Sequence, residues 1–198
     1  MHGILLILWC LFLTACGGGD GVFPESGSGA TYCGVVTGTQ RIAGKVTSVH
    51  DGDTITVNSQ SIRLNSIDAP ELAQAYGSQS RDHLSGLVLG QQVTVTYDQK
   101  DLYDRVLGTV FKPDCSNVNL SQVASGAAWY YEAYKCEIDI HQRKAFAAAQ
   151  ASAKAAAQGL WAAAAVAPWV FRNGVDAKVP ASCPNGDAPS NSSGSDPY

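Results

Sequence analysis

Five short segments of this chain are predicted β-strands, and most of them alternate apolar and polar residues as half-buried strands do. They span residues 42–49, 54–58, 61–64, 91–97 and 106–111. In the fourth segment, Val93, Val95 and Tyr97 fall on one face. The polar break at Ser59 and Gln60 predicts a hairpin between the second and third segments. The sequence therefore predicts a small sheet of short strands.

Helical patterns occur between and after these strands. Three segments end at a glycine, which is typical of a helix C-terminus: residues 72–89 before Gly90, 120–125 before Gly126, and 138–158 before Gly159. The longest segment is rich in alanine, and Phe146 is the large side chain of its apolar face, so it should pack closely on the sheet. Short strands mixed with helices predict an α+β domain built on a small barrel.

The length and composition allow one domain with flanking segments. The chain has 198 residues, of which 45% are hydrophobic and 15% are charged, which is too apolar for a wholly disordered chain. Residues 33–178 are predicted to form the domain. Residues 16–32 are rich in glycine and serine, as in a flexible tether, and residues 179–198 have the composition of a disordered tail.

The first residues have the features of an export signal. Residues 4–13 are almost entirely apolar, too short to span a membrane but long enough for a signal-peptide core. The motif L-T-A-C at residues 13–16 resembles the lipobox of bacterial lipoproteins. We therefore expect residues 1–15 to be a signal peptide and Cys16 to carry a lipid that anchors the protein in a membrane of the cell envelope. Since the first three residues include no Lys or Arg, the alternatives are an uncleaved anchor and an ordinary secretory signal, which would give a periplasmic or secreted protein.

The remaining cysteines fit an oxidising compartment. Outside the export signal there are four: Cys33, Cys115, Cys136 and Cys183. None has the spacing of a zinc ligand or a thiol-redox motif, so an even number predicts two disulfides with three possible pairings. We favour Cys115 with Cys136, which would close a loop of moderate length, and Cys33 with Cys183, which would tie the ends of the domain together.

Acidic residues gather where the predicted hairpin begins and ends, in the motifs D-G-D at 51–53 and D-A-P-E at 68–71. If the hairpin turn is centred on the polar break, Asp51 lies opposite Asp68, and Asp53 lies diagonal to Asp68. Carboxylates crowded in this way repel one another unless a cation lies between them, and oxygen ligands favour Ca²⁺ or Mg²⁺. The alternative is that D-G-D is only a turn, because Asp and Gly are common turn residues.

Six motifs follow one another in a specific order between residues 41 and 172. They are D-G-D-T at 51–54, R-L-x-x-I-D-A-P-E at 63–71, D-L-Y-D-R-V-L-G at 101–108, G-A-A-W-Y-Y at 126–131, G-L-W at 159–161 and P-W-V-F-R at 168–172. Each motif alone is a weak signal, whereas the ordered series is highly specific. In this series the chain resembles the staphylococcal-nuclease-like (thermonuclease) family.

The resemblance implies a five-stranded OB-fold barrel with three helices, which agrees with the pattern of strands and helices. It also implies a Ca²⁺-dependent phosphodiesterase, an endonuclease of the micrococcal-nuclease type that acts on DNA and RNA. By motif position, the metal would be held by Asp53, Asp68 and the main-chain carbonyl of Ala69. Glu71 would activate or position the attacking water, and the phosphate would be held by Arg63 and Arg105.

These residue types suit the implied chemistry. A phosphodiester gains negative charge at its oxygens during in-line attack, so a cation and two guanidiniums bind the transition state better than the substrate. However, Arg63 lies five residues before Asp68, a separation of about 16 Å along a straight strand. If both belong to one site, the chain must bend between them.

Each of these residues also has a simpler explanation. Arg63 taken alone would be a solvated strand residue, and Arg105 would pair with Asp101 or Asp104. Glu71 would be an acid at a helix N-terminus, stabilised there by the helix dipole.

Residues 101–108 depart from the family pattern at two positions. Asp104 stands where the family usually has glycine, and Leu102 stands where a basic residue is common. A carboxylate next to Arg105 should weaken anion binding unless it points away or holds a neighbour. Tyr103 is retained and would contact a phosphate or stack on a base, although a half-buried strand tyrosine is the alternative.

Two other classes of function remain open at this point: a catalytically inactive OB-fold module that binds nucleic acid or protein, and a structural calcium site in an envelope protein. The combination of carboxylates with two arginines favours the enzyme, because a binding barrel has no need of carboxylates that repel phosphate. The net charge is −4, but residues 41–172 carry 12 basic and 12 acidic side chains. The domain is therefore neutral, which indicates local, metal-assisted capture of phosphate. We expect a monomer without an obligate protein partner.

Overall fold

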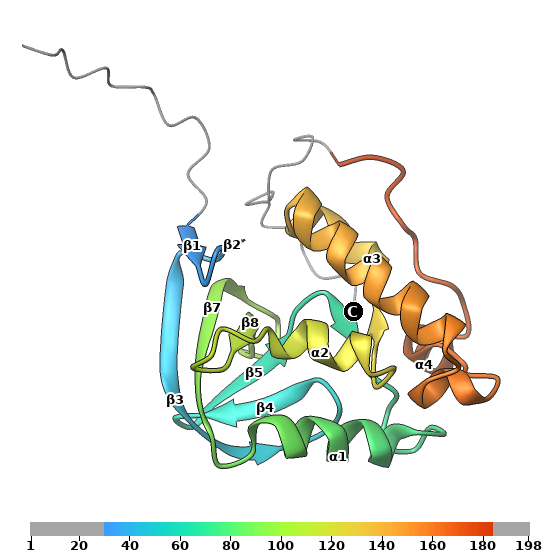
Figure 1. Cartoon of the computed structure of the whole chain (residues 1–198), viewed down its shortest axis with the longest axis horizontal. Helices are drawn as coiled ribbons and strands as arrows, with labels where there is room; N and C mark the ends of the chain where they lie inside the picture. The colour runs from blue at the N-terminus through green and yellow to red at the C-terminus, as the bar shows by residue number, and fades with distance from the viewer. Residues whose placement is uncertain (1–29, 184–198) are drawn as a thin grey trace, which may run out of the picture.

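The computed structural model of the protein describes residues 30–183. Its centre is a closed barrel of five strands (Figure 1). The strands are β3 (Gln40–Val49), β4 (Thr54–Val57), β5 (Gln60–Leu64), β7 (Gln92–Lys100) and β8 (Val106–Phe111). Their order around the barrel is β3-β4-β5-β8-β7, and all neighbours are antiparallel except β5 and β8, which are parallel. This confirms the predicted α+β class and five-stranded OB-fold barrel.

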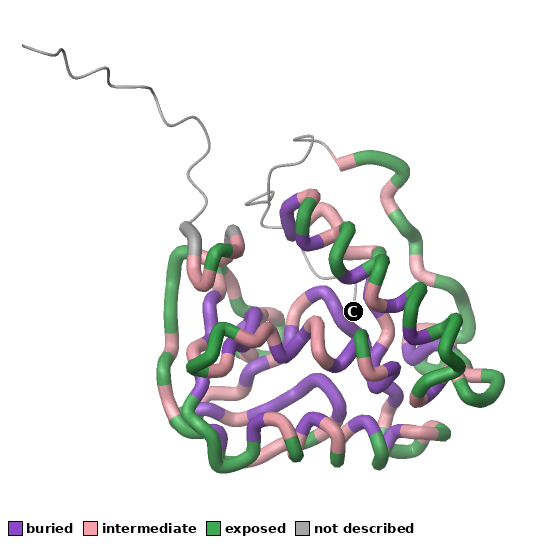
Figure 2. The backbone as a smooth tube through the Cα atoms, viewed as in Figure 1, coloured by how far each residue is buried: buried purple, intermediate pink, exposed green. Residues whose placement is uncertain are grey.

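The inward-facing side chains of the strands form a continuous apolar core. Ile55, Ile62, Leu64, Val95 and Val110 are all completely buried, and buried stretches run along the barrel strands in Figure 2. Alternate residues of a strand point to opposite faces, so the alternation in the sequence places its apolar half inside the barrel.

The hairpin between β4 and β5 has a different register from the predicted one. Val57 pairs with Gln60, so the turn consists of Asn58 and Ser59 rather than being centred between Ser59 and Gln60. Both turn residues have positive φ angles, 49° and 65°. Such a two-residue turn matches the twist of the flanking strands. The predicted placement of Asp51 opposite Asp68 was therefore wrong.

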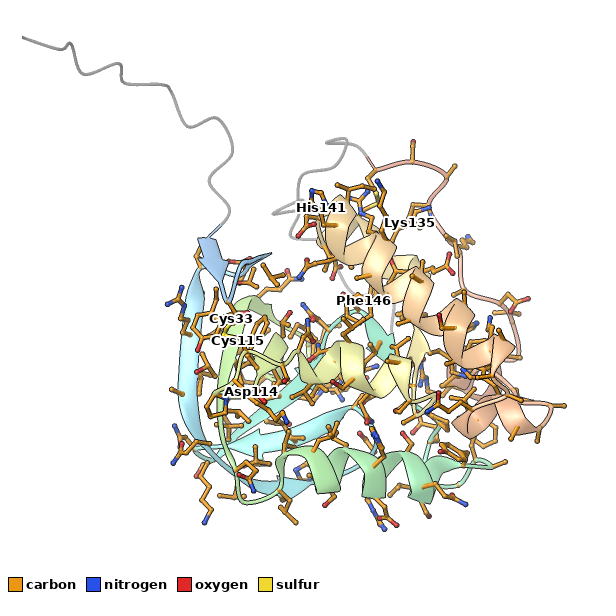
Figure 3. All side chains as sticks on the ribbon, viewed as in Figure 1. Cys33, Asp114, Cys115, Lys135, His141 and Phe146 are labelled. Atoms are coloured by element: carbon orange, nitrogen blue, oxygen red, sulfur yellow. A yellow bond between two sulfur atoms is a disulfide. The ribbon has the colours of Figure 1, made fainter. Side chains whose placement is uncertain are left out.

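The three predicted helices are α1 (Gly77–Val88), α2 (Val118–Ala124) and α3 (Ile140–Ala155). The first begins at Gly77 rather than at residue 72, because residues 71–76 form turns in which Tyr76 has a φ of 70°. In α3, Phe146 is buried and stacks on Tyr130 of β9, with 5.5 Å between the ring centroids (Figure 3). The alanine-rich helix thus packs mainly against α2 and β9, and not on the barrel as predicted.

Several short elements complete the fold: β1 (Ala30–Tyr32), β2 (Val35–Thr37), β6 (Ile67–Asp68), β9 (Trp129–Tyr130), the 3₁₀ helices η1 (Glu132–Glu137) and η2 (Gly159–Ala162), and α4 (Pro168–Asn173). β6 pairs with β9, which places Asp68 opposite Trp129. The helix α4 was not predicted. It has Pro168 in its first turn and ends at Gly174, where φ is 72°.

Two disulfides form, as predicted, but the favoured pairing was wrong. Cys33 is bonded to Cys115, and Cys136 is bonded to Cys183. The β1–β2 hairpin explains the first bond, because its Tyr32 hydroxyl donates to the hydroxyl of Thr94 on the barrel and brings the neighbouring Cys33 beside the loop that follows β8 (Figure 3). Cys136 lies in η1, which directly precedes α3, and its bond to Cys183 ties this element to the C-terminal segment that follows α4.

The predictions for the chain ends fall mainly outside residues 30–183. The signal peptide (1–15), the lipid-bearing Cys16 and residues 184–198 of the predicted tail all lie there. The last three residues of the predicted tether form β1. Among the described helices, none has the length and apolar character needed to cross a membrane.

Candidate active site

The D-G-D loop, residues 51–53, follows β3 and directs Asp53 into the protein, where it is only 5% exposed. Gly52 is required for this path, because a Cβ atom there would overlap the hydroxyl of Ser80 on α1. The buried side-chain amide of Gln122 on α2 donates to the carbonyl of Gly52 at 2.6 Å. Contacts with α1 and α2 therefore fix the loop in place. The D-G-D motif is more than a simple turn, because it positions Asp53 in the site.

A sharp bend after β5 brings Asp68 next to Arg63. In the bend, Ser66 has a φ of 63°. The buried side-chain amide of Asn119 on α2 donates to the main-chain carbonyl of Asn65 (3.0 Å) and to its side-chain oxygen (2.9 Å). As a result, Nη2 of Arg63 lies 2.9 Å from Oδ1 of Asp68. The bend that a shared site requires is present.

We expect Asn119→Ala to lower the free energy of unfolding by about 2–3 kcal/mol, because it leaves buried hydrogen-bonding groups of the bend without a partner. Urea denaturation would measure the change. Asn117→Ala is the matched control, because Asn117 only caps the same helix through the N–H of Leu120 and should cost about 1 kcal/mol. Equal losses of stability in the two variants would contradict the assigned role of Asn119.

Arg63 lies between two carboxylates. Its Nε is 3.2 Å from Oδ1 of Asp53, and its Nη2 contacts Asp68. Its Nη1 donates to the carbonyls of Leu64 (2.7 Å) and Ile67 (2.9 Å). Burial alone would lower the pKa of Arg63, but the two carboxylates outweigh this effect and raise it. The guanidinium is therefore held charged and in one orientation.

The pKa of Asp53 is also strongly perturbed. Burial raises the pKa of its carboxyl to about 8, Arg63 opposes the rise, and the carboxylates of Asp51 and Asp68 add to it. The N–H of Ala69 donates to Oδ2 of Asp53 at 2.7 Å, which also favours the charged form. Burial therefore favours the protonated form of Asp53 despite the nearby guanidinium, and a bound cation would favour the carboxylate.

Arg105 is paired with Asp101, one of its two predicted partners. Its Nε is 2.7 Å from Oδ2 of Asp101, whose other oxygen accepts the main-chain N–H groups of Tyr103 and Arg105. Among the described residues, Asp101 is the only acceptor for the Arg105 side chain, so its terminal amino groups are available to a phosphate. Tyr103 is 67% exposed and lies in the loop before β8, so it is not a half-buried strand residue.

The second predicted partner, Asp104, points away from the site. Its φ of 60° is left-handed, which explains why glycine suits this position. Its carboxylate is 79% exposed and lies 2.8 Å from the ammonium of Lys100. The added negative charge is thus screened by solvent and by a lysine, and the neighbouring Leu102 is exposed.

Glu71 is not the helix N-terminal acid of the simpler explanation, because α1 begins only at Gly77 and has no acidic residue in its first turn. Its carboxylate is instead 2.7 Å from Nη1 of Arg172 on α4. Arg172 was not predicted as a site residue, since 101 residues separate it from Glu71. The only sequence signal was its place at the end of the P-W-V-F-R motif.

One cavity of about 670 Å³ joins these groups. It is lined by all seven residues predicted for the site: Asp53, Arg63, Asp68, Ala69, Glu71, Tyr103 and Arg105. Arg172 and two further tyrosines, Tyr131 and Tyr134, also line it. The volume is within the range of pockets that hold small-molecule ligands.

The residues of the cavity fit an oxygen-coordinated cation. Among residues 30–183, no group of three or more His, Cys, Asp or Glu side chains is arranged to hold a metal ion. The predicted set of metal ligands differs from such a group, because it consists of only two carboxylates and a main-chain carbonyl. Oδ1 of Asp53 lies 3.2 Å from Nε of Arg63, and Oδ1 of Asp68 lies 2.9 Å from Nη2 of the same guanidinium. The two carboxylates are therefore close enough for one cation to reach both. All-oxygen donors of this kind suit Ca²⁺ or Mg²⁺, with waters completing the coordination.

The closed barrel and the cavity beside it define an OB-fold protein with a site that combines carboxylates and arginines. The sequence profile of staphylococcal nuclease homologues matches residues 61–163. The chain belongs to this family, as the ordered motifs indicated.

Named relatives agree with this assignment. A protein of Escherichia coli named as an uncharacterized endonuclease is 44% identical over 137 residues, which cover 67% of this chain and 86% of the relative. A micrococcal nuclease of Shigella flexneri is 37% identical over 142 residues, or 65% of this chain and 79% of the relative. An uncharacterized endonuclease of Haemophilus influenzae is 37% identical over 123 residues, which cover 60% of this chain and 65% of the relative.

Proposed function

We propose that this protein is a Ca²⁺-dependent nuclease that hydrolyses phosphodiester bonds of DNA, RNA or both. The observation that carries the proposal is the convergence of two buried carboxylates, an exposed carboxylate and two arginines on one cavity. The nuclease names of the relatives support the same activity. An inert binding barrel would have no use for this combination.

Each side chain has a task in the proposed reaction. Arg105 donates to the phosphate with its terminal amino groups, while Asp101 fixes its Nε. Arg63 stabilises the charge that develops on the phosphate oxygens, and it also orients the carboxylates of Asp53 and Asp68. Glu71, at the more exposed side of the cluster, orients a water molecule and accepts its proton. Tyr103, exposed beside Arg105, contacts the phosphate or a base.

Asp53, Asp68 and the carbonyl of Ala69 would hold the Ca²⁺ ion. When bound, the ion would supply positive charge to a phosphate oxygen and to the attacking water. Calcium suits this donor set because it accepts carboxylates, carbonyls and waters in flexible geometry.

We expect the purified protein to cleave nucleic acid in Ca²⁺ and to lose at least about tenfold of its rate in EGTA. The assay would use single- and double-stranded DNA and RNA, and excess Ca²⁺ should restore the rate. Cleavage that does not change on chelation would disprove the calcium dependence. Binding without cleavage in either condition would instead favour an inactive binding module.

We also propose that the protein is exported and carried on the cell envelope as a monomer, anchored by a lipid on Cys16. Two disulfides support an oxidising compartment. Metabolic labelling with a radioactive fatty acid would test the anchor, and Cys16→Ser should abolish the label. A labelled Cys16→Ser protein would refute lipidation at that residue.

A further inference from the structure

The short helix α4 places Arg172 on two carboxylates of the cavity. Its Nη1 lies 2.7 Å from Oε1 of Glu71 and 3.2 Å from Oδ1 of Asp68, and its Nη2 lies 2.8 Å from Oδ2 of Asp68. One planar guanidinium thus joins the proposed water-orienting carboxylate to a proposed metal ligand. This geometry fixes both carboxylates relative to each other.

The position of Arg172 is determined by packing as well as by charge. Trp169, one turn earlier on α4, packs against Trp129 of β9 and against Tyr131, with centroid separations of 5.4 and 5.1 Å. Trp129 is itself the strand partner of Asp68. The arginine and the carboxylate that it binds are therefore connected through one cluster of aromatic rings and one strand pair.

Arg172 also affects how Asp68 can bind a metal ion. Both oxygens of Asp68 are engaged by guanidiniums, Oδ1 by Arg63 and Oδ2 by Arg172. A cation that binds Asp68 must share an oxygen with one of these guanidiniums or displace it, and a positive charge within about 3 Å of the ligand oxygen opposes its binding. Arg63 is also bonded to Asp53 and to the main-chain carbonyls of Leu64 and Ile67.

We propose that Arg172 is a positioning residue that holds Glu71 beside Asp68 and, by occupying an oxygen of Asp68, lowers the affinity of the site for a divalent cation. The inference rests on the proposed nuclease function, and it identifies a residue that regulates metal binding at the same site. Arg172 thus has two opposite effects: it weakens the binding of the cation and makes the bound site more active.

Calorimetric titration of the full protein with Ca²⁺ alone tests the first effect. Arg172→Gln should bind Ca²⁺ about tenfold more tightly than the wild type, because a competing positive charge is gone. Arg172→Lys should give an intermediate affinity, since one ammonium cannot join both carboxylates. Arg81→Gln is the matched control: Arg81 is an exposed arginine of α1 that pairs with Asp82 and does not line the cavity, so its loss should leave the affinity unchanged.

Kinetics at saturating Ca²⁺ test the second effect. Arg172→Gln should lower kcat about tenfold with little change in KM, because Glu71 loses its restraint while the phosphate-binding arginines remain. A damaged fold would weaken Ca²⁺ binding, so tighter binding together with slower turnover separates positioning from a structural defect. Unchanged or weaker Ca²⁺ binding by Arg172→Gln and Arg172→Lys would overturn the inference. If the wild type cleaves nothing, the proposed function fails, while the titration still decides the role of Arg172.

Discussion

Replacing Glu71 with glutamine should lower kcat by about 10²- to 10⁴-fold, the range typical for the loss of a general base. The amide is nearly the same size as the carboxylate but cannot accept a proton from water. Arg172 keeps its bidentate contact with Asp68, so the fold of the site should persist. Steady-state kinetics on a defined oligonucleotide in saturating Ca²⁺ would measure the change, and KM should stay within a few-fold.

Glu132→Gln is the matched control for this variant. Glu132 is exposed at the start of η1 and does not line the cavity, so the same chemical change there should leave kcat unaltered. If Glu71→Gln retained more than a tenth of the wild-type kcat, Glu71 would not be the base.

Asp68→Asn should lower the free energy of unfolding by about 2–4 kcal/mol in the absence of Ca²⁺. The Asp68 carboxylate is 1% exposed and is the shared partner of Arg63 and Arg172, so an amide there leaves two partly buried guanidiniums without their counter-charge. Urea denaturation in EGTA would measure this loss. The same variant should also bind Ca²⁺ more weakly, which calorimetry would detect.

Asp53→Asn should differ from Asp68→Asn in how its stability depends on pH, because burial raises the pKa of Asp53 to about 8. The folded state then holds a proton that the unfolded chain has released, so the wild type loses stability as pH rises from about 4 toward 8. An asparagine cannot titrate, so in EGTA the stability of Asp53→Asn should fall less between pH 5 and pH 9. An equal fall in both proteins would contradict the raised pKa.

The barrel could be predicted from the sequence because its strands follow a local rule. Alternate residues of a strand face opposite sides, so an apolar residue at every second position marks β4, β5 and β7, whereas β8 is a short, mostly apolar run. The register of the β4–β5 hairpin did not follow from the same rule. It depends on Asn58 and Ser59 both adopting positive φ angles, and an Asn-Ser pair does not specify such a turn as strongly as Asn-Gly does.

In the site too, contacts between residues close in sequence could be predicted, and contacts between distant residues could not. Asp53 and Asp68 lie close in sequence to one hairpin, so their proximity could be expected, although it arises through the bend at Ser66 rather than through opposite strand positions. Arg172 reaches Asp68 across 104 residues of chain. Its contact depends on aromatic packing of α4 against β9, which no periodicity or spacing in the sequence encodes.

The disulfide pairing could not be predicted for the same reason, since it depends on contacts between distant parts of the chain. Four cysteines in an exported chain predict two bonds, but the choice among three pairings depends on where the β1–β2 hairpin and the C-terminal segment lie on the barrel. Loop length favoured joining Cys115 to Cys136. In the folded protein, each of these two cysteines is instead bonded to a cysteine near one end of the described chain, Cys115 to Cys33 and Cys136 to Cys183.

The parallel pairing of β5 with β8 has a consequence for how this enzyme tolerates change. Arg63 pairs with Leu107, so the distance between Arg63 and the start of β8, which Arg105 directly precedes, is set by strand register. The chain that connects the two strands, which includes α1 and β7, does not set it. Residues inserted in the turn between α1 and β7 would lengthen the connection at a cost that grows only slowly with loop length. The spacing of the two arginines that we propose to bind phosphate would be unchanged, so this turn is a suitable place to attach an additional recognition segment.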